Sequence, residues 1–365
     1  MRRIMTERRV HLLLSSAIFA CMMVVFTACD DDNDRSPTGP GDTSTDGGWT
    51  EVASPVSTHL HRVGFMSPNE GWIVGESGTI LRSRDQGDSW SVVEPGLTDE
   101  YLYDVDFAGS AVYICGSETT LLKGVPTESG YQWSSMTIPN GTEYYRCVQF
   151  AGSTTGWVLE SNWHHGFVRF WYIGSDGLWG RGAGIPYDED FSASDFHFTS
   201  NMLPDAEDGG KLKHEGWLCG YMGEAPGGTG QLYRSADGGK TWSLVLEESE
   251  SYFKQIHFID EKHGWIAKTW GMLTTTDGGS TWQSHDFTSS LVMPHRLCFT
   301  DINTGWTAMP AGTLHHTTDG GASWTEQTHD GASLPTVNDI HMIDHSTGII
   351  VCRDGQIFKT MSGGK

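Results

Sequence analysis

The sequence predicts an all-β fold, a seven-bladed β-propeller in which an N-terminal strand completes the last blade. Three observations support this fold: a box that recurs four times, a Gly-Trp pair at a fixed distance after an apolar residue, and a step of about 42 residues. The chain has 365 residues, of which 46 are glycine and 15 are tryptophan. An excess of turn-forming and large packing residues is what one structural position filled repeatedly would produce.

The recurring box has the form S/T-x-D-x-G-x-S/T-W. Its copies cover residues 83–90, 235–242, 275–282 and 317–324. In each copy the Asp is expected to accept hydrogen bonds from its own turn, the Gly to adopt a positive φ, and the Trp to pack against a neighbouring hairpin. These roles are structural rather than catalytic. They belong to Asp85, Asp237, Asp277, Asp319, Trp90, Trp242, Trp282 and Trp324.

Each unit starts from an apolar lead residue, which the Gly-Trp pair or its degenerate equivalent follows. The seven lead residues are Phe65, Phe107, Phe150, Phe198, Phe258, Phe299 and Met342. Apolar runs separated by Gly-bearing turns predict four short strands per unit, which is the size of one blade. The last unit stops at residues 358–365, where a box begins without its Trp, and residues 46–52 supply the missing half. The N-terminal strand is therefore expected to close the ring, which leaves no open end blade.

The first 47 residues predict an export signal and a tether. Residues 1–28 combine a basic start, an apolar run and small residues before Cys29, which is typical of a cleaved signal. Residues 26–29 resemble a bacterial lipobox, which would make Cys29 the lipidated first residue of the mature chain. The alternatives are an uncleaved anchor helix and an ordinary export signal. Residues 29–47 are acidic and rich in Pro, Gly, Ser and Thr, as in flexible tethers, and the propeller then covers 48–365.

The net charge limits the kinds of partner that the chain can bind, and the spacing of its cysteines bears on metal sites and disulfides. The formal net charge is −23, and removal of residues 1–28 takes away four arginines and one glutamate, which leaves −26. Such a chain is a poor ligand for nucleic acid and for anionic membrane surfaces, which attract Lys and Arg. The cysteines of the propeller lack metal-ligand spacing, so no zinc site is expected. The sequence leaves open whether two of them form a disulfide. The cysteines of the propeller are Cys115, Cys147, Cys219, Cys298 and Cys352.

The repeated box resembles the Asp-box, also called the bacterial neuraminidase repeat. The pattern F-x-D-x-x-x-G-W followed by G-x-I or G-x-L and the box is most similar to the photosystem II assembly and stability factors and their bacterial relatives. Residues 258–265 and 299–306 fit it closely, and the resemblance covers about residues 48–362. It implies an exported scaffold that binds a membrane-protein subunit without catalysis. The acidic sequence lacks the basic surface cluster of the photosynthetic members.

We therefore expect a monomeric, non-catalytic lipoprotein of the bacterial cell envelope that binds an envelope protein or a glycan. No cofactor, metal or nucleic acid is expected, and the membrane is contacted through the N-terminal lipid only. The binding face is formed by the loops before each lead residue and after each Gly-Trp strand, where aromatic side chains gather. The candidates there are Arg62, Tyr103, Tyr144, Tyr145, Arg146, Trp163, His164, Tyr187, Tyr252, Trp270 and Arg296.

The alternative function is a glycoside hydrolase, either sialidase-like or xyloglucanase-like. Sialidases with this repeat clamp a substrate carboxylate with three arginines, and Arg62, Arg146 and Arg296 occupy similar places in three units. Acidic candidates near the same loops are Asp104, Asp106, Glu160 and Asp195. No spacing singles out a catalytic carboxylate pair among them. The three arginines must converge for the sialidase-like form to hold.

Overall fold

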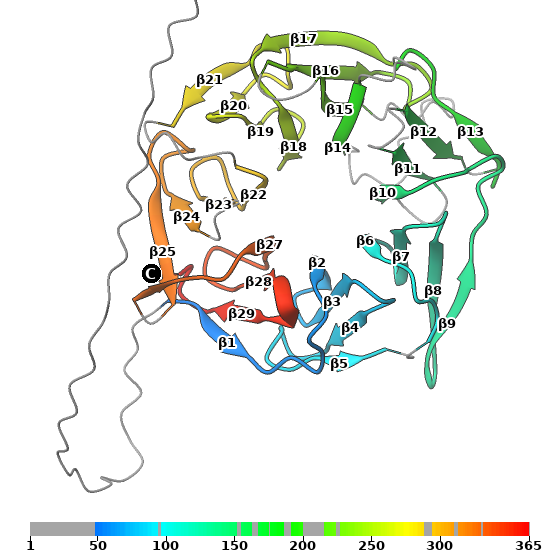
Figure 1. Cartoon of the computed structure of the whole chain (residues 1–365), viewed down its shortest axis with the longest axis vertical. Helices are drawn as coiled ribbons and strands as arrows, with labels where there is room; N and C mark the ends of the chain where they lie inside the picture. Colours follow the sequence, from blue (N-terminus) through cyan, green and yellow to red (C-terminus); the bar gives the residue numbers. More distant parts are fainter. Residues whose placement is uncertain are drawn as a thin grey trace, which may run out of the picture. The chain divides into compact units, whose positions relative to one another are not determined.

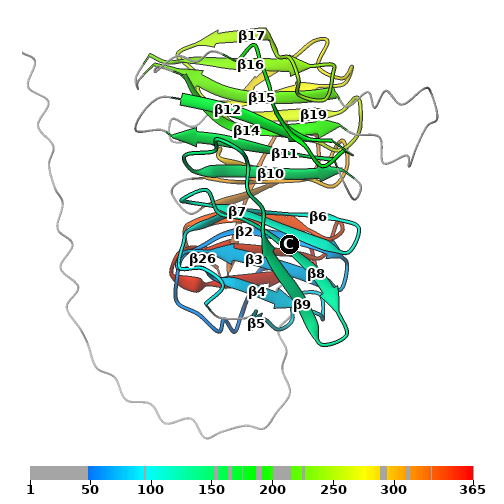
Figure 2. The same cartoon turned by 90° about the vertical axis from the view of Figure 1, so that its right-hand side faces the viewer.

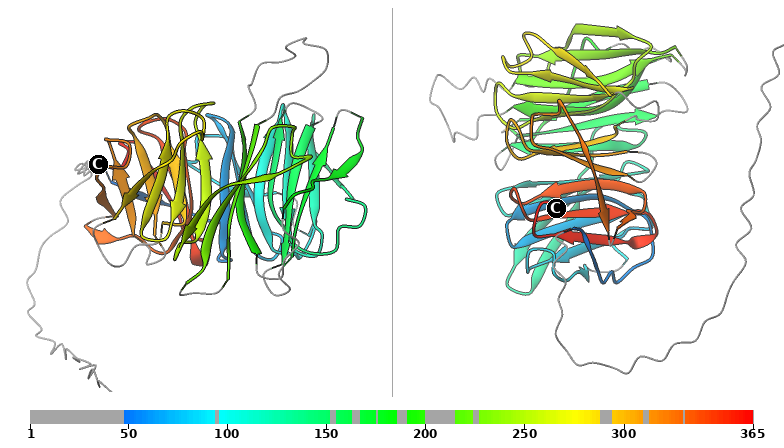
Figure 3. Two further views of the ribbon diagram at one scale, coloured as in Figure 1. Left: turned by 90° about the horizontal axis from the view of Figure 1, so that it is seen from above. Right: turned by 90° about the vertical axis from the view of Figure 1, so that its left-hand side faces the viewer.

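Seven antiparallel sheets stand in a ring around a central channel, and each sheet is one blade (Figure 1). The computed structural model describes residues 48–93, 96–151, 155–162, 167–174, 176–185, 191–199, 215–223, 227–287, 294–309, 313–329 and 331–364. The expected signal peptide, the tether and Cys29 lie outside these residues. Figures 2 and 3 show the ring edge-on, with strands that run between its two faces.

The first three blades follow the chain in order, each with its innermost strand first. Blade 1 contains β2 (Leu60–Ser67), β3 (Glu70–Gly75), β4 (Ile80–Ser83) and β5 (Ser91–Val92). Blade 2 contains β6 (Leu102–Ala108), β7 (Ala111–Gly116), β8 (Leu121–Thr127) and β9 (Gly130–Ser135). Blade 3 contains β10 (Tyr145–Ala151), β11 (Thr155–Asn162), β12 (Phe167–Ile173) and β13 (Trp179–Arg181).

The next three blades keep this order, and blade 6 adds a short fifth strand that the repeat does not predict. Blade 4 contains β14 (Phe191–Thr199), β15 (Glu215–Met222), β16 (Thr229–Ser235) and β17 (Ser243–Ser249). Blade 5 contains β18 (Phe253–Phe258), β19 (Gly264–Lys268), β20 (Gly271–Thr275) and β21 (Gln283–Asp286). Blade 6 contains β22 (Arg296–Phe299), β23 (Gly305–Ala308), β24 (Leu314–Thr317), β25 (Thr325–His329) and β26 (Ala332–Ser333).

Blade 7 holds both ends of the described chain. It consists of β27 (Val337–Met342), β28 (Gly348–Cys352), the short 3-10 turn η1 (Arg353–Gly355), β29 (Ile357–Thr360) and β1 (Thr50–Val52). Strand β1 pairs with β29 in Figure 1, with Thr50 opposite Lys359. The Gly364 N–H donates to Thr360 Oγ1 at 2.8 Å, as Gly87 does to Ser83 Oγ in a continuous box. The predicted seven-bladed propeller and its closure by the N-terminal strand are confirmed.

The Gly-Trp tryptophans join adjacent blades. They are Trp72, Trp157, Trp217, Trp265 and Trp306, and none is more than 3% exposed. Three of them donate their indole N–H to a glycine carbonyl in the box of the next blade. These bonds run from Trp157 to Gly238, from Trp265 to Gly320 and from Trp306 to Gly363. A buried indole N–H needs such a partner, so this bond fixes the register between blades.

The boxes are closed by local hydrogen bonds on the turn between the third and fourth strands. Asp319 accepts the Ser323 hydroxyl at 2.6 Å and its N–H at 2.8 Å. These two bonds, the hydroxyl first, lower the pKa of Asp319 to about 2. The Gly321 N–H donates to Thr317 Oγ1 at 3.0 Å, and Gly321 has a φ of 98°. The same bonds to hydroxyl and N–H recur at Asp85, Asp237 and Asp277.

The five cysteines of the propeller are free thiols, so the disulfide that the sequence left open does not form. Three of them are buried, and the other two are partly buried. In the part of the chain that the structure describes, we find no helix with the length and apolar character needed to span a membrane.

Candidate functional site

The two faces of the ring are built from different connections. The loops that lead into each inner strand and the turns between second and third strands share one face, which we call the entry face. In blade 2 it includes residues 98–101 and 117–120. The boxes lie on the opposite face, because each box follows a third strand. The sequence predicts the binding residues on the entry face.

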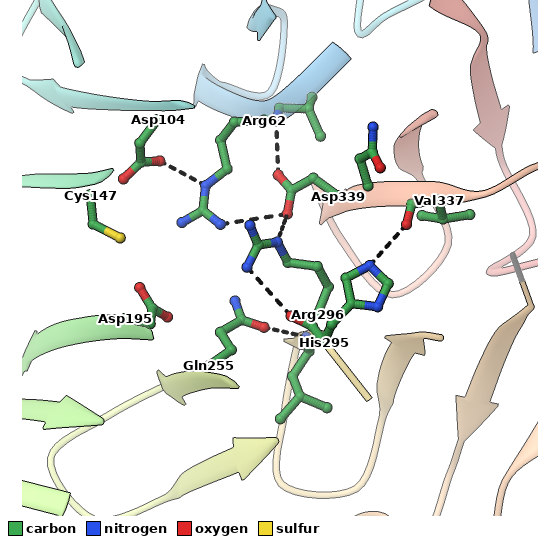
Figure 4. A network of polar contacts seen from close by, with 12 residues as sticks. Arg62, Asp104, Cys147, Asp195, Gln255, His295, Arg296, Val337 and Asp339 are labelled. Atoms are coloured by element: carbon green, nitrogen blue, oxygen red, sulfur yellow. Dashed lines mark hydrogen bonds and ion pairs between the residues drawn. The ribbon is translucent and has the colours of Figure 1, made fainter. Parts of the chain in front are cut away.

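Seven equivalent side chains point into the channel, three positions before each lead residue. We call them the channel ring, and all seven are drawn in Figure 4. The channel ring consists of Arg62, Asp104, Cys147, Asp195, Gln255, Arg296 and Asp339. In six blades a register shift, the mark of a β-bulge, comes immediately before this position. Such bulges re-aim side chains, and here they direct the ring residues inward.

The charges of the channel ring pair with one another. Arg62 Nε lies 2.7 Å from Asp104 Oδ1, and Arg62 Nη1 lies 3.6 Å from Asp339 Oδ1. Arg296 Nε lies 3.3 Å from the same Asp339 oxygen. Burial raises the pKa of Asp195 to about 6, although the Arg62 and Arg296 charges act against this shift. Burial also raises the pKa of Asp104, against the lowering effect of Arg62.

The carboxylates of the channel ring also hold neighbouring blades together. Asp339 accepts the N–H of Val63 at 2.9 Å, and Asp104 accepts that of Val148 at 2.9 Å. Asp195 accepts the N–H of Ile256 at 3.2 Å. Each acceptor lies one blade before its donor. The donors belong to innermost strands, whose channel-facing edge has no other strand to pair with. These side chains therefore take the place of a missing strand, which is a structural role.

The arginines do not form the clamp that the sialidase-like alternative requires. Arg62 and Arg296 approach Asp339, whereas the Arg146 guanidinium lies 4.5 Å from the ring centre of Tyr103. Glu160, an acidic candidate of that alternative, is fully buried in blade 3. It accepts the N–H of Thr142 at 2.8 Å and the Trp171 indole at 2.7 Å. Glu160 therefore acts as an internal acceptor of blade 3.

Blades 2 and 3 form a hollow of about 330 Å³ on the entry face. We call it the tyrosine pocket. It is lined by Asp99, Glu100, Tyr101, Tyr103, Ser117, Glu118, Tyr144 and Arg146. The Arg146 guanidinium lies 5.4 Å from the Tyr144 ring centre as well as over Tyr103. Burial raises the pKa of Tyr103, and the positive charge of Arg146 opposes this shift.

A second cluster of aromatic rings and a cation lies between blades 4 and 5. Lys254 Nζ is 4.3 Å from the ring centre of Tyr221 and 5.3 Å from that of Tyr252. The two rings meet edge to face at 4.5 Å. Nearby in blade 5, Trp270 is 52% exposed and has a φ of 66°, an uncommon conformation for a bulky residue.

The predicted binding residues fall into four groups, of which the last lies outside the described residues. Tyr103, Tyr144 and Arg146 come together in the tyrosine pocket, and Trp270 lies exposed on the same face. Tyr145, with 1% exposure, and Tyr252, with 8%, are buried instead, because their rings fill the space between blades. Arg62 and Arg296 belong to the channel ring. Outside the described residues lie Trp163, His164 and Tyr187.

Sequence reasoning missed the acidic half of the tyrosine pocket. Asp99, Glu100 and Glu118 come from two separate connections of blade 2, and nothing in their local sequence marks them. The signal that was available is their place in the repeat, directly before the first strand and in the turn after the second. Within the described residues, no three His, Cys, Asp or Glu side chains gather as a metal ion would require.

Seven blades joined by these boxes, with a channel whose charges are paired internally, define an Asp-box propeller. The chain belongs to the family described as "Photosynthesis system II assembly factor YCF48", whose model matches residues 42–142 and 242–365. A BNR/Asp-box repeat also matches residues 233–244. The resemblance stated from the motifs is thereby confirmed.

Two curated relatives illustrate this membership. The Photosystem II assembly protein Ycf48 of Synechococcus sp. (strain JA-2-3B'a(2-13)) is 27% identical, over 62% of this chain and 87% of its own. The Photosystem II assembly lipoprotein Ycf48 of Picosynechococcus sp. (strain ATCC 27264 / PCC 7002 / PR-6) is 22% identical, over 62% of this chain and 61% of its own.

The solved structures share the fold at lower identity. YCF48 from Cyanidioschyzon merolae has a TM-score of 0.66 at 17% identity, covering 86% of this chain and 98% of its own. A structure of YCF48 bound to D1 peptide has a TM-score of 0.64 at 17% identity, covering 86% of this chain and 97% of its own.

Proposed function

We propose that this chain is a non-catalytic assembly propeller that binds a segment of an envelope protein on its entry face. The observation that carries this proposal is the contrast between the channel and the entry face. The charged groups of the channel are taken up by ion pairs and by backbone N–H groups. The entry face instead offers an open hollow with tyrosine walls, which suits the side chains of a peptide.

Membership of the family supports a protein partner. A relative with the same fold is bound to D1 peptide, and assembly is the activity for which the relatives are named. The acidic charge of −23 differs from the basic cluster of photosynthetic members, so the partner of this chain is an envelope protein of different surface chemistry. A glycan is the other ligand that exposed aromatic rings suit.

We also propose that the chain is exported and held at the envelope by a lipid on Cys29, with residues 29–47 as a tether. The basic start, apolar run and small residues before Cys29 support this proposal. A relative that is itself named a lipoprotein supports it further. The described propeller offers no helix that could anchor it in a membrane.

Site-directed photo-crosslinking tests the binding face. A photoreactive phenylalanine replaces Tyr101, which is 47% exposed on the entry face. The matched control replaces Leu178, which is 70% exposed in the turn between β12 and β13, on the opposite face. Irradiation of native envelopes should give one discrete protein adduct from position 101 and none from position 178. Equal adducts from both positions, or a signal only on a glycan array, would contradict the proposal.

A further inference from the structure

One half of the channel rim is closed by hydrogen bonds between blades. The rim positions directly precede the channel ring, and they are His61, Tyr103, Arg146, Ser194, Lys254, His295 and Asn338. His61 Nδ1 lies 2.8 Å from the Leu102 carbonyl oxygen, and His295 Nε2 lies 3.0 Å from that of Val337. Asn338 donates to the Leu60 carbonyl at 2.7 Å. Blades 6, 7 and 1 thus use their rim side chains to tie the ring together.

Blades 2 and 3 use their rim side chains differently. Tyr103 and Arg146 contact each other, with the guanidinium over the tyrosine ring, and the His61 ring also stacks on Tyr103, with ring centres 5.7 Å apart. This stack spans three blades, and its members Tyr103 and Arg146 line the tyrosine pocket. Because these side chains extend along the surface, the hollow between the blades stays open.

The charge of the tyrosine pocket is negative. Asp99, Glu100 and Glu118 contribute three carboxylates, against the one guanidinium of Arg146. Asp99 and Glu118 are exposed, and Glu100 is fixed because its carboxylate accepts the Ser117 hydroxyl at 2.6 Å. An anionic ligand would meet net repulsion here, whereas a cation would meet carboxylates and the faces of tyrosine rings.

The acidic rim of the pocket is held in place by an unusual turn. Glu118 and Thr119 have φ values of 49° and 60°, where the matching turn of blade 1 has Ser77 and Gly78 at 53° and 65°. Thr119 donates its N–H to the Glu143 carbonyl at 3.0 Å, which ties the turn to blade 3. A tight turn anchored at both ends presents Glu118 to the pocket with little freedom to move.

We propose that the tyrosine pocket binds a lysine or arginine side chain of the partner segment. The cationic head contacts the carboxylates of Asp99 and Glu118, and its aliphatic stem lies along the exposed ring of Tyr101. This inference rests on the proposed function and adds the chemistry of the partner to it. Charge complementarity carries it, because the hollow combines a net negative lining with aromatic walls of suitable size for one long side chain.

Fluorescence anisotropy with the full-length chain in detergent micelles tests the pocket. The probe is a fluorescein-labelled octapeptide of glycine and leucine with two lysines, and its controls carry two glutamines or two glutamates instead. We expect the lysine peptide to bind at least about tenfold more tightly than the glutamine peptide, and the glutamate peptide more weakly still. Equal binding of the lysine and glutamine peptides would overturn the proposal.

Matched variants separate the pocket from the overall negative charge. The double change Asp99→Asn and Glu118→Gln should weaken the lysine peptide by about fivefold or more. The control changes Glu128→Gln and Glu326→Gln remove the same charge from exposed positions outside the pocket, and should have less than about a twofold effect. Equal losses of lysine-peptide affinity in the two double variants would overturn the proposal, because the overall negative charge of the protein would then explain binding. Tyr101→Phe should retain binding that Tyr101→Leu loses, with melting curves to verify the fold.

The two proposals fail separately. If position 101 crosslinks a partner in envelopes but the lysine peptide binds no more tightly than the glutamine peptide, the proposal of a cationic side chain in the pocket is wrong and the protein-binding function stands. If the lysine peptide depends on Asp99 and Glu118 but no partner crosslinks at position 101, the pocket chemistry stands and the assembly function is wrong.

Discussion

Asp195 of the channel ring stabilises the fold through a hydrogen bond and destabilises it through the burial of its charge. Its carboxylate accepts the Ile256 N–H, which joins blades 4 and 5. It is only 5% exposed, and burial raises its pKa to about 6 despite the Arg62 and Arg296 charges. Between pH 4 and 6 the folded state therefore holds a proton that the unfolded chain has released. The stability that this group contributes at low pH is lost as the pH rises through about 6.

Asp195→Asn should remove this pH-dependent cost while it keeps an oxygen to accept the Ile256 N–H. The variant should be more stable than the parent at pH 8, by up to about 3 kcal/mol, and the difference should shrink towards pH 4. Urea midpoints at a series of pH values measure this difference. Glu128→Gln, at an exposed position, is the control and should show no such trend. A constant difference for Asp195→Asn across the series would contradict the pKa shift.

Residues of the boxes and residues of the channel differ in how far the sequence reveals them. The hydrogen-bond partners of Asp319 lie within four positions of it in the chain, so the motif alone predicts these hydrogen bonds. Asp104 finds its partners in Arg62 and Val148, about one repeat away in either direction. The seven channel-ring positions carry four residue types, so the repeat pattern hides their equivalence. In the sequence, their equivalence appears only when the units are aligned on their lead residues.

At the scale of elements, the seventh blade depends on a strand from the other end of the chain. Trp49, directly before β1, is 2% exposed and packs with Trp306, Leu334 and Phe358. Its carbonyl oxygen lies 2.5 Å from His329 Nδ1 of blade 6. The three residues of β1 that pair with β29 would hold this strand only weakly. The buried Trp49 side chain therefore supplies much of the free energy that closes the ring.

Trp49→Ala should destabilise the ring by about 3–5 kcal/mol, because it leaves a cavity at the closure. The control is Trp270→Ala, at a half-exposed position outside the core, which should cost less than about 1 kcal/mol. Thermal and urea midpoints of the two variants provide the comparison. Similar losses for both variants would mean that the closure strand contributes little to the stability of the ring.

Element order followed from the sequence because each blade repeats a local pattern. Lead residues, Gly-Trp pairs and boxes gave the number of blades and the split last blade. The fifth strand β26 of blade 6 escaped this reasoning, since its two residues pair only through the turn that follows β25. The bulge before six of the seven channel-ring positions was also missed, although it interrupts the apolar alternation: in β6 the buried residues Leu102 and Val105 lie three positions apart rather than two or four.

At the scale of the whole molecule, the described propeller and the proposed anchor do separate tasks. The ring provides a rigid face, and residues 29–47 would let that face reach a partner at a distance from the membrane. The strong negative charge works against adsorption to anionic lipid, so attachment would rest on the lipid of Cys29.

Cys29→Ala should release the protein from the membrane fraction of its host, while the parent protein stays with the membranes. The physical reason is that the acyl chains supply the apolar surface that the bilayer buries. Immunoblots of separated membrane and soluble fractions measure the distribution. A variant that remains in the membrane fraction would favour an uncleaved anchor helix, and a parent protein found in the soluble fraction would favour an ordinary export signal.

The sequence by itself determined the seven blades, their boxes and the closure by residues from both ends, because these follow from a short pattern repeated at a regular step. The tertiary structure alone decided which side chains work together. The channel ring joins residues of different type from different blades, and the tyrosine pocket joins two connections of blade 2 to the start of blade 3. Such groups form across blade interfaces, where neighbours lie about 42 residues apart and no local periodicity relates them.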